Sequence, residues 1–314
     1  MLWFTLGGVM VCLACLTVYR ARKFTEKAER DTPPIGQFID VEGTPVHYVK
    51  QGSGPALVML HGAGGHVKDF TFDNVARFAK DFTVIAFDRP GHGYTPILEN
   101  PGASLTQQAH LIEQALDKLG IQNAIIMGFS YGGSLALHLA THYKELTKGL
   151  VLISAVSMPW PGNIHLNYRI MSKPVIGPAL MAVSTAYFGD AFFRANYATV
   201  FDPRNAPNGY LDHVGVNMSV RFKFFVENAR QLNNLRPQVV EQSNLYSKMD
   251  IPIELIHGDL DTSVPVQFHA KEFLKIVPHA NLVVVENMGH GTHQLAIPQI
   301  EAAVYAVVDR LNNT

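Results

Sequence analysis

One serine in this 314-residue sequence has the surroundings of a nucleophile. Ser130 is the centre of a G-x-S-x-G pattern over residues 128–132, directly after the apolar run 124–127. A helix-compatible spacing of apolar residues begins after it, so the pattern lies where a strand turns sharply into a helix. Such a turn exposes the hydroxyl near the positive end of the helix, where developing negative charge is stabilised. A glycine-rich turn with a capping serine is the competing interpretation; the strand–turn–helix context favours a nucleophile.

A serine nucleophile needs a neighbouring base, and the sequence offers fourteen histidines for this role. His290 follows the apolar run 282–285 through a short loop, which places it at the carboxyl edge of a sheet, where Ser130 also emerges. His293 is the next candidate, although local hydrogen bonding or the start of a helix explains it more simply. His257 ends a strand and is interpreted as a core histidine. We therefore predict His290 as the base.

Short apolar runs alternate with longer helical patterns along most of the chain, which indicates βα units around a mostly parallel sheet. The expected strands are 37–41, 45–50, 56–60, 83–87, 124–127, 150–153, 253–256 and 282–285. Helical spacing is found at 105–119, 131–143 and about 298–311. The segment 158–249 has no buried-strand run and is rich in aromatic residues, Pro, Gly and Asn. It predicts short amphipathic helices inserted between two core strands.

Four further motifs follow these strands. They are His61-Gly62, Asp88-Arg89-Pro90-Gly91-His92-Gly93, Gly258-Asp259-Leu260-Asp261 with Val264-Pro265, and Gly289-His290. Together with the serine pattern and the order Ser, Asp, His, they make the sequence resemble the α/β-hydrolase superfamily over about residues 37–312. The resemblance implies a mostly parallel, eight-stranded sheet flanked by helices, with a helical cap. It divides the chain into a first core part (37–157), a cap (158–249) and a second core part (250–314).

The resemblance also suggests the remaining parts of a catalytic site. Asp261 stands where the family carries the acid that orients the histidine, whereas Asp259 more plausibly caps a turn. Asp88 resembles a structural turn of the family, and His61 usually has a structural role there. Acyl transfer generates an oxyanion that needs preorganised N–H donors. The expected donors are the backbone N–H groups of Tyr131 and of Ala63, with that of Gly64 as the alternative to Ala63.

These residues predict a serine hydrolase that cleaves a carboxylic ester through an acyl-enzyme. A serine in the nucleophile position argues against the haloalkane dehalogenases and epoxide hydrolases of the family. A C–C bond hydrolase acting on a vinylogous diketone is the enzymatic alternative, and a non-catalytic binding protein that retains the fold is the second. No metal-ligand spacing and no phosphate-binding glycine loop is evident, so we expect no cofactor and no metal.

The first twenty residues predict a transmembrane anchor (1–20). Leu2 to Tyr19 carry no charged side chain, and at about 1.5 Å per residue they span roughly the hydrocarbon core of a bilayer. Trp3 and Tyr19 suit the two membrane interfaces. The charged segment that follows, with its break at Pro33-Pro34, is interpreted as a linker (21–36).

Three alternatives to an anchor remain. A cleaved signal peptide would have a basic residue near its start, but no Lys or Arg precedes Arg20. A lipoprotein cysteine at Cys15 would need an aliphatic residue where Cys12 stands. A buried core helix is the third alternative, but the stretch is apolar all round and lies outside the part of the sequence that resembles the hydrolases. Basic residues after the apolar run favour a cytoplasmic catalytic domain, with the side left open; they are Arg20, Arg22, Lys23, Lys27 and Arg30.

Composition limits the remaining possibilities. With 47% hydrophobic and 16% charged residues, the chain can bury a substantial core. The formal net charge is −1 and no basic block occurs beyond the first 30 residues, so we expect no nucleic-acid partner. The expected partners are a small-molecule ester substrate and, through the apolar segment, a membrane. Both cysteines lie in the first 20 residues, so no disulfide stabilises the core.

Overall fold

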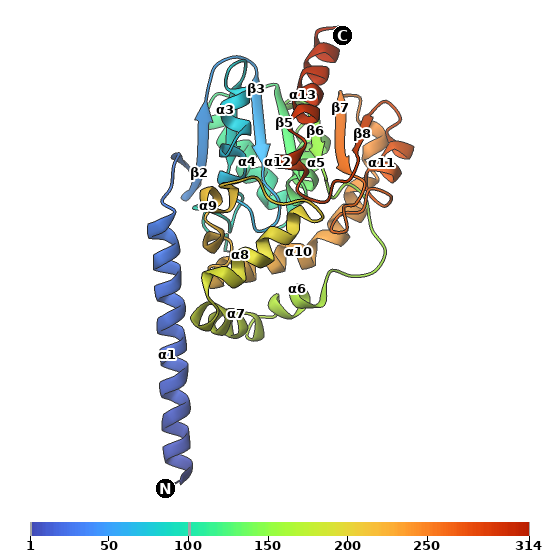
Figure 1. Ribbon diagram of the computed structural model, residues 1–314. Helices are drawn as coiled ribbons and strands as arrows, with labels where there is room; N and C mark the ends of the chain where they lie inside the picture. Colours follow the sequence, from blue (N-terminus) through green and yellow to red (C-terminus); the bar gives the residue numbers. More distant parts are fainter. Residues whose placement is uncertain (1, 100–101, 314) are drawn as a thin grey trace.

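The computed structural model describes residues 2–99 and 102–313, and within these ranges eight strands form one sheet (Figure 1). The strands are β1 Gln37–Val41, β2 Thr44–Gln51, β3 Ala56–Leu60, β4 Thr83–Phe87, β5 Ala124–Phe129, β6 Thr147–Ile153, β7 Ile253–Gly258 and β8 Asn281–Val285. Their order in the sheet is β1-β2-β4-β3-β5-β6-β7-β8. β2 runs antiparallel to both of its neighbours, and all other pairs are parallel. The predicted fold class is confirmed, and each predicted strand lies within an observed one.

Helices cover both faces of the sheet, which explains why the central strands are continuous apolar runs. They are α2 Lys68–Thr71, α3 Asn74–Phe78, α4 Leu105–Lys118, α5 Tyr131–His142, α11 Ala270–Ile276, α12 Thr292–Leu295 and α13 Ile297–Asn312. Along β3, Val58 and Leu60 pack with α4 and α5, whereas Leu57 and Met59 pack with α3 and α13. This alternation divides the core into two layers, one on each face of the sheet.

The parallel register determines where the chemistry can lie. β3, β5, β6, β7 and β8 point the same way, so their carboxyl ends meet at one edge of the sheet. Leu60, the last residue of β3, pairs with Gly128 near the end of β5. The loops after β3, β5, β7 and β8, which carry the motifs of the sequence, therefore lie together.

The insert between β6 and β7 is helical, as predicted, and we call residues 158–249 the cap. Its helices are α6 Leu166–Met171, α7 Ile176–Tyr187, α8 Asp190–Ala198, α9 Tyr210–Val214 and α10 Phe222–Ser243, with short 3₁₀ turns η1 Thr199–Phe201, η2 Val216–Met218 and η3 Tyr246–Lys248. Phe193, Phe201 and Tyr210 form a separate small apolar cluster. Other aromatic residues of the cap, among them Phe188 and Phe192, stay exposed.

The first helix, α1 (Leu2–Asp31), is long and apolar enough to cross a membrane. Its first half projects away from the rest of the molecule (Figure 1). The structure differs from the expected linker over 21–36, because the helix continues to Asp31 and only residues 32–36 connect it to β1. Packing explains the difference: Ala21 and Ala28 are buried, and Glu29 forms an ion pair of 2.7 Å with Arg221.

Candidate active site

The turn between β5 and α5 holds Ser130 in a strained backbone conformation, with φ 53° and ψ −117°. Close packing explains the flanking glycines. A Cβ on Gly128 would lie 2.4 Å from the Gly132 carbonyl oxygen, and a Cβ on Gly132 would lie 2.1 Å from the Leu60 carbonyl oxygen. The turn is therefore pressed against the end of β3, and Ser130 stands directly before the N-terminus of α5.

Ser130, His290 and Asp261 form a continuous chain of hydrogen bonds across three loops. The Ser130 hydroxyl lies 3.0 Å from His290 Nε2, and His290 Nδ1 lies 2.7 Å from Asp261 Oδ2. With Nδ1–H donating to the carboxylate, Nε2 is left to accept the serine proton. The backbone N–H groups of Ser263 and Val264 donate to the other Asp261 oxygen at 2.9 and 2.8 Å. The three residues predicted from the sequence thus meet at hydrogen-bonding distances.

The electrostatics of the carboxylate suit this arrangement. Burial by itself would raise the pKa of Asp261, but the neighbouring His290 imidazole and the backbone donors outweigh it and hold that pKa below its ordinary value of 3.8. Asp261 therefore stays ionised near neutral pH. His257 lies behind it, with Nε2 donating to the Val264 carbonyl oxygen at 2.6 Å, which agrees with its interpretation as a core residue.

The competing residues are engaged elsewhere. His293 Nε2 lies 3.0 Å from the Tyr210 hydroxyl, and its ring stacks on Phe129 with 3.9 Å between centroids. Burial lowers the pKa of His293 to about 3, so it stays neutral. Asp259 accepts the backbone N–H of Met288 at 3.0 Å and holds the turn, as expected. Neither residue takes part in the series of hydrogen bonds that ends on the Ser130 hydroxyl.

The loop after β3 (residues 61–65, the oxyanion loop) passes beside the serine. A Cβ on Gly62 would lie 3.2 Å from the Ser130 Cβ. The buried Arg89 guanidinium donates to the carbonyl oxygens of His61 and Gly62 at 3.0 and 2.9 Å. Because the N–H and C=O of a trans peptide point in opposite directions, the Ala63 N–H points away from Arg89. Arg89 therefore orients this loop from behind.

The expected N–H donors are placed differently from one another. Tyr131 begins α5, where an N–H has no intrahelical acceptor, and in the described part of the chain the Ala63 N–H makes no backbone hydrogen bond. Gly64, the alternative donor to Ala63, differs from our expectation, because its N–H already donates to the Asn228 side-chain oxygen at 2.9 Å. That hydrogen bond directs Gly64 toward the cap, so Ala63 and Tyr131 are the better-placed pair.

Asn228 was not predicted from the sequence. It lies on α10, is buried, and its oxygen also lies 3.1 Å from His92 Nε2. Two groups thereby fix the oxyanion loop: Asn228 of the cap binds the Gly64 N–H, and Arg89 binds the carbonyl oxygens of His61 and Gly62. No signal in the sequence could have identified Asn228, because it lies in an amphipathic helix without a motif and meets the loop across 164 positions.

A second unpredicted group lies beside the site. The buried Asp69 carboxyl accepts hydrogen bonds from the Tyr197 and Tyr210 hydroxyls at 3.1 and 3.0 Å. Burial raises the pKa of Asp69 to about 6, although both tyrosines favour its ionised form. Through Tyr210, this group reaches His293 and the ring of Phe129, which precedes Ser130.

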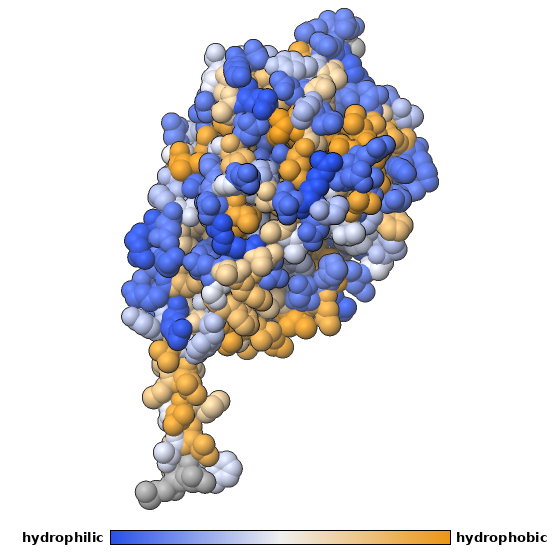
Figure 2. Space-filling model, viewed as in Figure 1, coloured by the Kyte–Doolittle hydropathy of each residue, from blue (hydrophilic) through white to orange (hydrophobic). Residues whose placement is uncertain are grey.

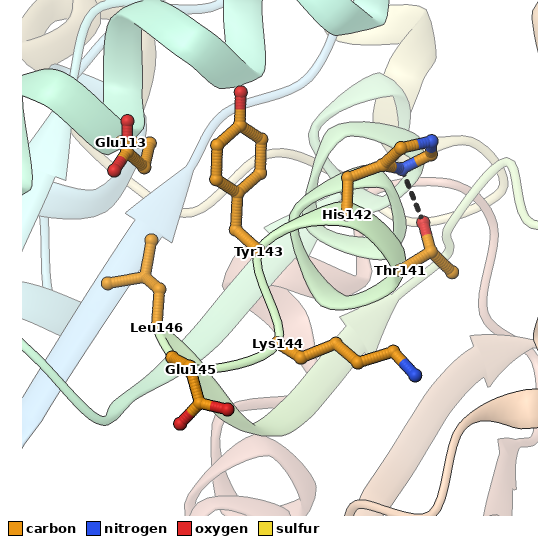
Figure 3. Close-up of a pocket in the computed structure, with 7 residues that line it drawn as sticks. All are labelled: Glu113, Thr141, His142, Tyr143, Lys144, Glu145 and Leu146. Atoms are coloured by element: carbon orange, nitrogen blue, oxygen red, sulfur yellow. Dashed lines mark hydrogen bonds between the residues drawn. The ribbon is translucent and has the colours of Figure 1, made fainter.

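An open pocket of about 410 Å³ lies elsewhere, at the C-terminal end of α5 (Figure 3). Its lining residues include Thr141, His142 and Tyr143, with Glu113 from α4. Ser130 stands at the other end of this 12-residue helix, which is about 18 Å long. The pocket is therefore separate from Ser130, His290 and Asp261, which we call the triad. Ser130 itself is only 8% exposed.

Comparison with known proteins agrees with this geometry. The chain is 28% identical over 280 residues to an uncharacterized protein of Mycobacterium tuberculosis, covering 86% of this chain and 80% of that one. It is 29% identical over 277 residues to the 2-hydroxymuconate semialdehyde hydrolase of Pseudomonas putida, covering 84% and 91%. The solved structure of a membrane phospholipase A matches along the whole of both chains with a TM-score of 0.71 and 19% identity, a likeness of fold. The alpha/beta hydrolase family matches residues 57–306, and the chain belongs to that family.

Proposed function

We propose that this protein is a membrane-anchored serine hydrolase that cleaves a carboxylic ester with a hydrophobic acyl or aryl group. The observation that carries the proposal is the continuous series of hydrogen bonds from Ser130 through His290 to the ionised Asp261. This is the arrangement that turns a serine hydroxyl into a nucleophile at neutral pH. The family membership and the esterases among its structural relatives support the same reaction class.

In the proposed reaction His290 Nε2 takes the Ser130 proton as the oxygen attacks the ester carbonyl carbon. The resulting oxyanion accepts hydrogen bonds from the backbone N–H groups of Ala63 and Tyr131, and Asp261 stabilises the imidazolium that forms. Collapse expels the alcohol, which receives the proton from His290 and leaves an acyl-enzyme. His290 then activates water, which attacks the acyl carbon and releases the acid and the free serine.

Hydrolysis of a C–C bond is the second candidate, because the relative from Pseudomonas putida is a 2-hydroxymuconate semialdehyde hydrolase. Both reactions would use the same triad, so the fold cannot choose between them. A panel of p-nitrophenyl esters of increasing acyl length, run beside a vinylogous diketone, distinguishes them. We expect ester turnover that rises with acyl length; uniform inactivity on the esters with turnover of the diketone would reverse the assignment.

Labelling with a fluorophosphonate probe tests whether the site reacts at all. We expect the intact protein to be labelled and the Ser130→Ala variant not. Ser134→Ala is the matched control, since the Ser134 hydroxyl lies four residues along and donates to the Val156 carbonyl oxygen. Absence of labelling in the intact protein would favour a non-catalytic binding protein that retains the fold.

The membrane part of the proposal rests on α1. An uncharged stretch from Leu2 to Tyr19 is long enough to cross a bilayer, and residues 3–16 are exposed. The basic residues that follow favour a cytoplasmic catalytic domain. Sedimentation with membranes at high salt and at alkaline pH tests the anchor, and reporter fusions at the C-terminus test its orientation. Release of the full chain by alkali would contradict the anchor.

A further inference from the structure

The cap carries an exposed apolar surface that its own packing does not explain. α7 places Ile176, Leu180, Val183 and Tyr187 at intervals of three and four residues, on one side of the helix. The opposite side, which includes Met181 and Ala186, is buried. α7 therefore carries apolar side chains on its exposed side as well as on its buried side, which is typical of a helix covered on both sides.

This surface continues beyond α7. We define the cap apolar face as Ile176, Leu180, Val183, Tyr187, Phe188 and Phe192, whose side chains are 40–53% exposed. The Phe188 and Phe192 rings contact each other with 4.6 Å between centroids. Figure 2 shows hydrophobic colour gathered on the lower part of the globular domain, beside the point where α1 emerges. Continuous apolar patches of this kind on a folded domain mark an interaction site.

The contacts of α1 determine where this face lies relative to the anchor. The Thr17 hydroxyl lies 2.9 Å from the Tyr187 hydroxyl, and the Arg20 guanidinium lies 4.9 Å from the Tyr187 ring centroid. Further along, Phe24 packs on Phe193. Residues 3–16 are all exposed, and Thr17 is the first residue after them whose side chain is half-buried. The anchor therefore meets the cap at the end of α7.

The same level is where the apolar part of α1 ends. Arg20 is the first charged residue after the uncharged stretch, so the membrane surface lies near Tyr19 and Arg20. Tyr187 touches α1 at this height and carries the amphipathic ring that membrane interfaces favour. The cap apolar face extends along the cap from Tyr187, so it begins at the level of α1 where the uncharged stretch ends.

Charge around the face fits a lipid surface better than a second copy of this chain. Exposed Arg169 and Lys173 precede α7 in the cap, and exposed Arg22 lies on α1. The acidic Asp190, between Phe188 and Phe192, pairs with Lys27 at 3.4 Å, and Lys23 pairs with Glu26 at 2.7 Å. Basic side chains at this depth are attracted to anionic headgroups. Two copies facing each other through this surface would bring these like charges together.

We propose that the cap apolar face rests on the same bilayer that holds α1, with its side chains among the headgroups and the first acyl carbons. This inference depends on the proposed anchoring of α1 and goes beyond it, because it makes the cap a second membrane contact. The consequence is a fixed orientation of the catalytic domain: the cap faces the lipid, and the edge of the sheet opposite the cap faces away from it.

The test uses the full chain in liposomes that contain phosphatidylcholine and phosphatidylglycerol. Cys12 and Cys15 are replaced by Ser, so that single cysteines can carry an environment-sensitive fluorophore. One probe is placed by Val183→Cys in the cap apolar face. The matched control is Val283→Cys on β8, because both valines are about equally exposed, 47% and 42%. A third probe, Leu13→Cys, reports on the anchor.

We expect lipids with a nitroxide near the headgroup to quench the Val183 probe strongly and to leave the Val283 probe unchanged. Emission of the Val183 probe should also shift to the blue when the protein passes from detergent into liposomes. Quenching of the Leu13 probe by deeper nitroxides shows that the anchor is inserted. If the Leu13 probe is quenched and the Val183 probe is not, this inference is overturned while the anchor stands.

Two other outcomes also overturn the inference. If no probe is quenched, the anchor fails, and the membrane contact of the cap fails with it. If the Val183 probe is shielded from both lipid nitroxides and aqueous quenchers, a second copy covers the face. Cross-linking through Val183→Cys would then identify that copy.

Discussion

Asp69 makes stability depend on pH in a direction opposite to that of most carboxylates. It is 2% exposed, accepts two tyrosine hydroxyls, and has a pKa raised from 3.8 to about 6. Between these values the native state binds more protons than the unfolded state, so this residue's contribution to stability is present below about pH 4 and is lost as pH rises toward 6. The rise of the Asp69 pKa to about 6 corresponds to a loss of about 3 kcal/mol in the free energy of unfolding between acidic and neutral pH.

The Asp69→Asn variant removes this dependence, because an amide does not ionise. We therefore expect the stability of the native protein, measured against the variant, to fall by about 3 kcal/mol between about pH 4 and about pH 7. Unfolding entropy is about 2 cal/mol/K per residue, so for a chain of this size the relative Tm should fall by about 5 °C. Comparing the two proteins at each pH cancels the contributions of all other titrating groups.

Thermal unfolding of both proteins in the same detergent, followed by circular dichroism across this range, measures the effect. Tyr197→Phe is the companion variant: it removes a donor that favours the ionised form, so the dependence should become steeper. A Tm difference that stays constant with pH, or that moves in favour of the native protein as pH rises, would refute the reasoning. It would mean that the tyrosine hydroxyls outweigh burial.

Three catalytic predictions follow from the candidate site. His290→Ala should lower kcat by about 10⁴-fold or more, and near-normal ester turnover would transfer the role to His293. Asp261→Asn should lower kcat by about 10⁴-fold through the wrong tautomer of the histidine, while Asp259→Asn should change it little; the opposite ranking in the same assay would reassign the acid. Asn228→Ala should lower kcat by about tenfold at nearly constant KM, because it frees the oxyanion loop without touching the substrate. An effect of Asn228→Ala on KM alone would place that residue in substrate binding.

Much of the fold is a local property of the sequence. The central strands β3, β4, β5 and β7 contain short apolar runs that the sequence shows directly, and the sharp turn at Ser130 needs glycines that are visible as a pattern. Parallel strands in a sheet bring their carboxyl ends to one edge, so a serine, an aspartate and a histidine on the loops after three strands could be placed together in advance. The choice of Asp261 over Asp259 depended on the family resemblance, and the geometry agrees with it.

What the sequence could not determine are contacts between segments that follow no common pattern. Asn228 reaches the oxyanion loop from the cap, and Asp69 meets Tyr197 and Tyr210 across more than 120 positions. The charged end of α1 is interpreted as a linker from the sequence, because the sequence does not show the cap residues Phe193 and Arg221, which Phe24 and Glu29 contact. Periodicity reports only how one segment faces its surroundings. Which surroundings it meets is decided when distant segments bury their side chains against each other, and that depends on the whole tertiary structure.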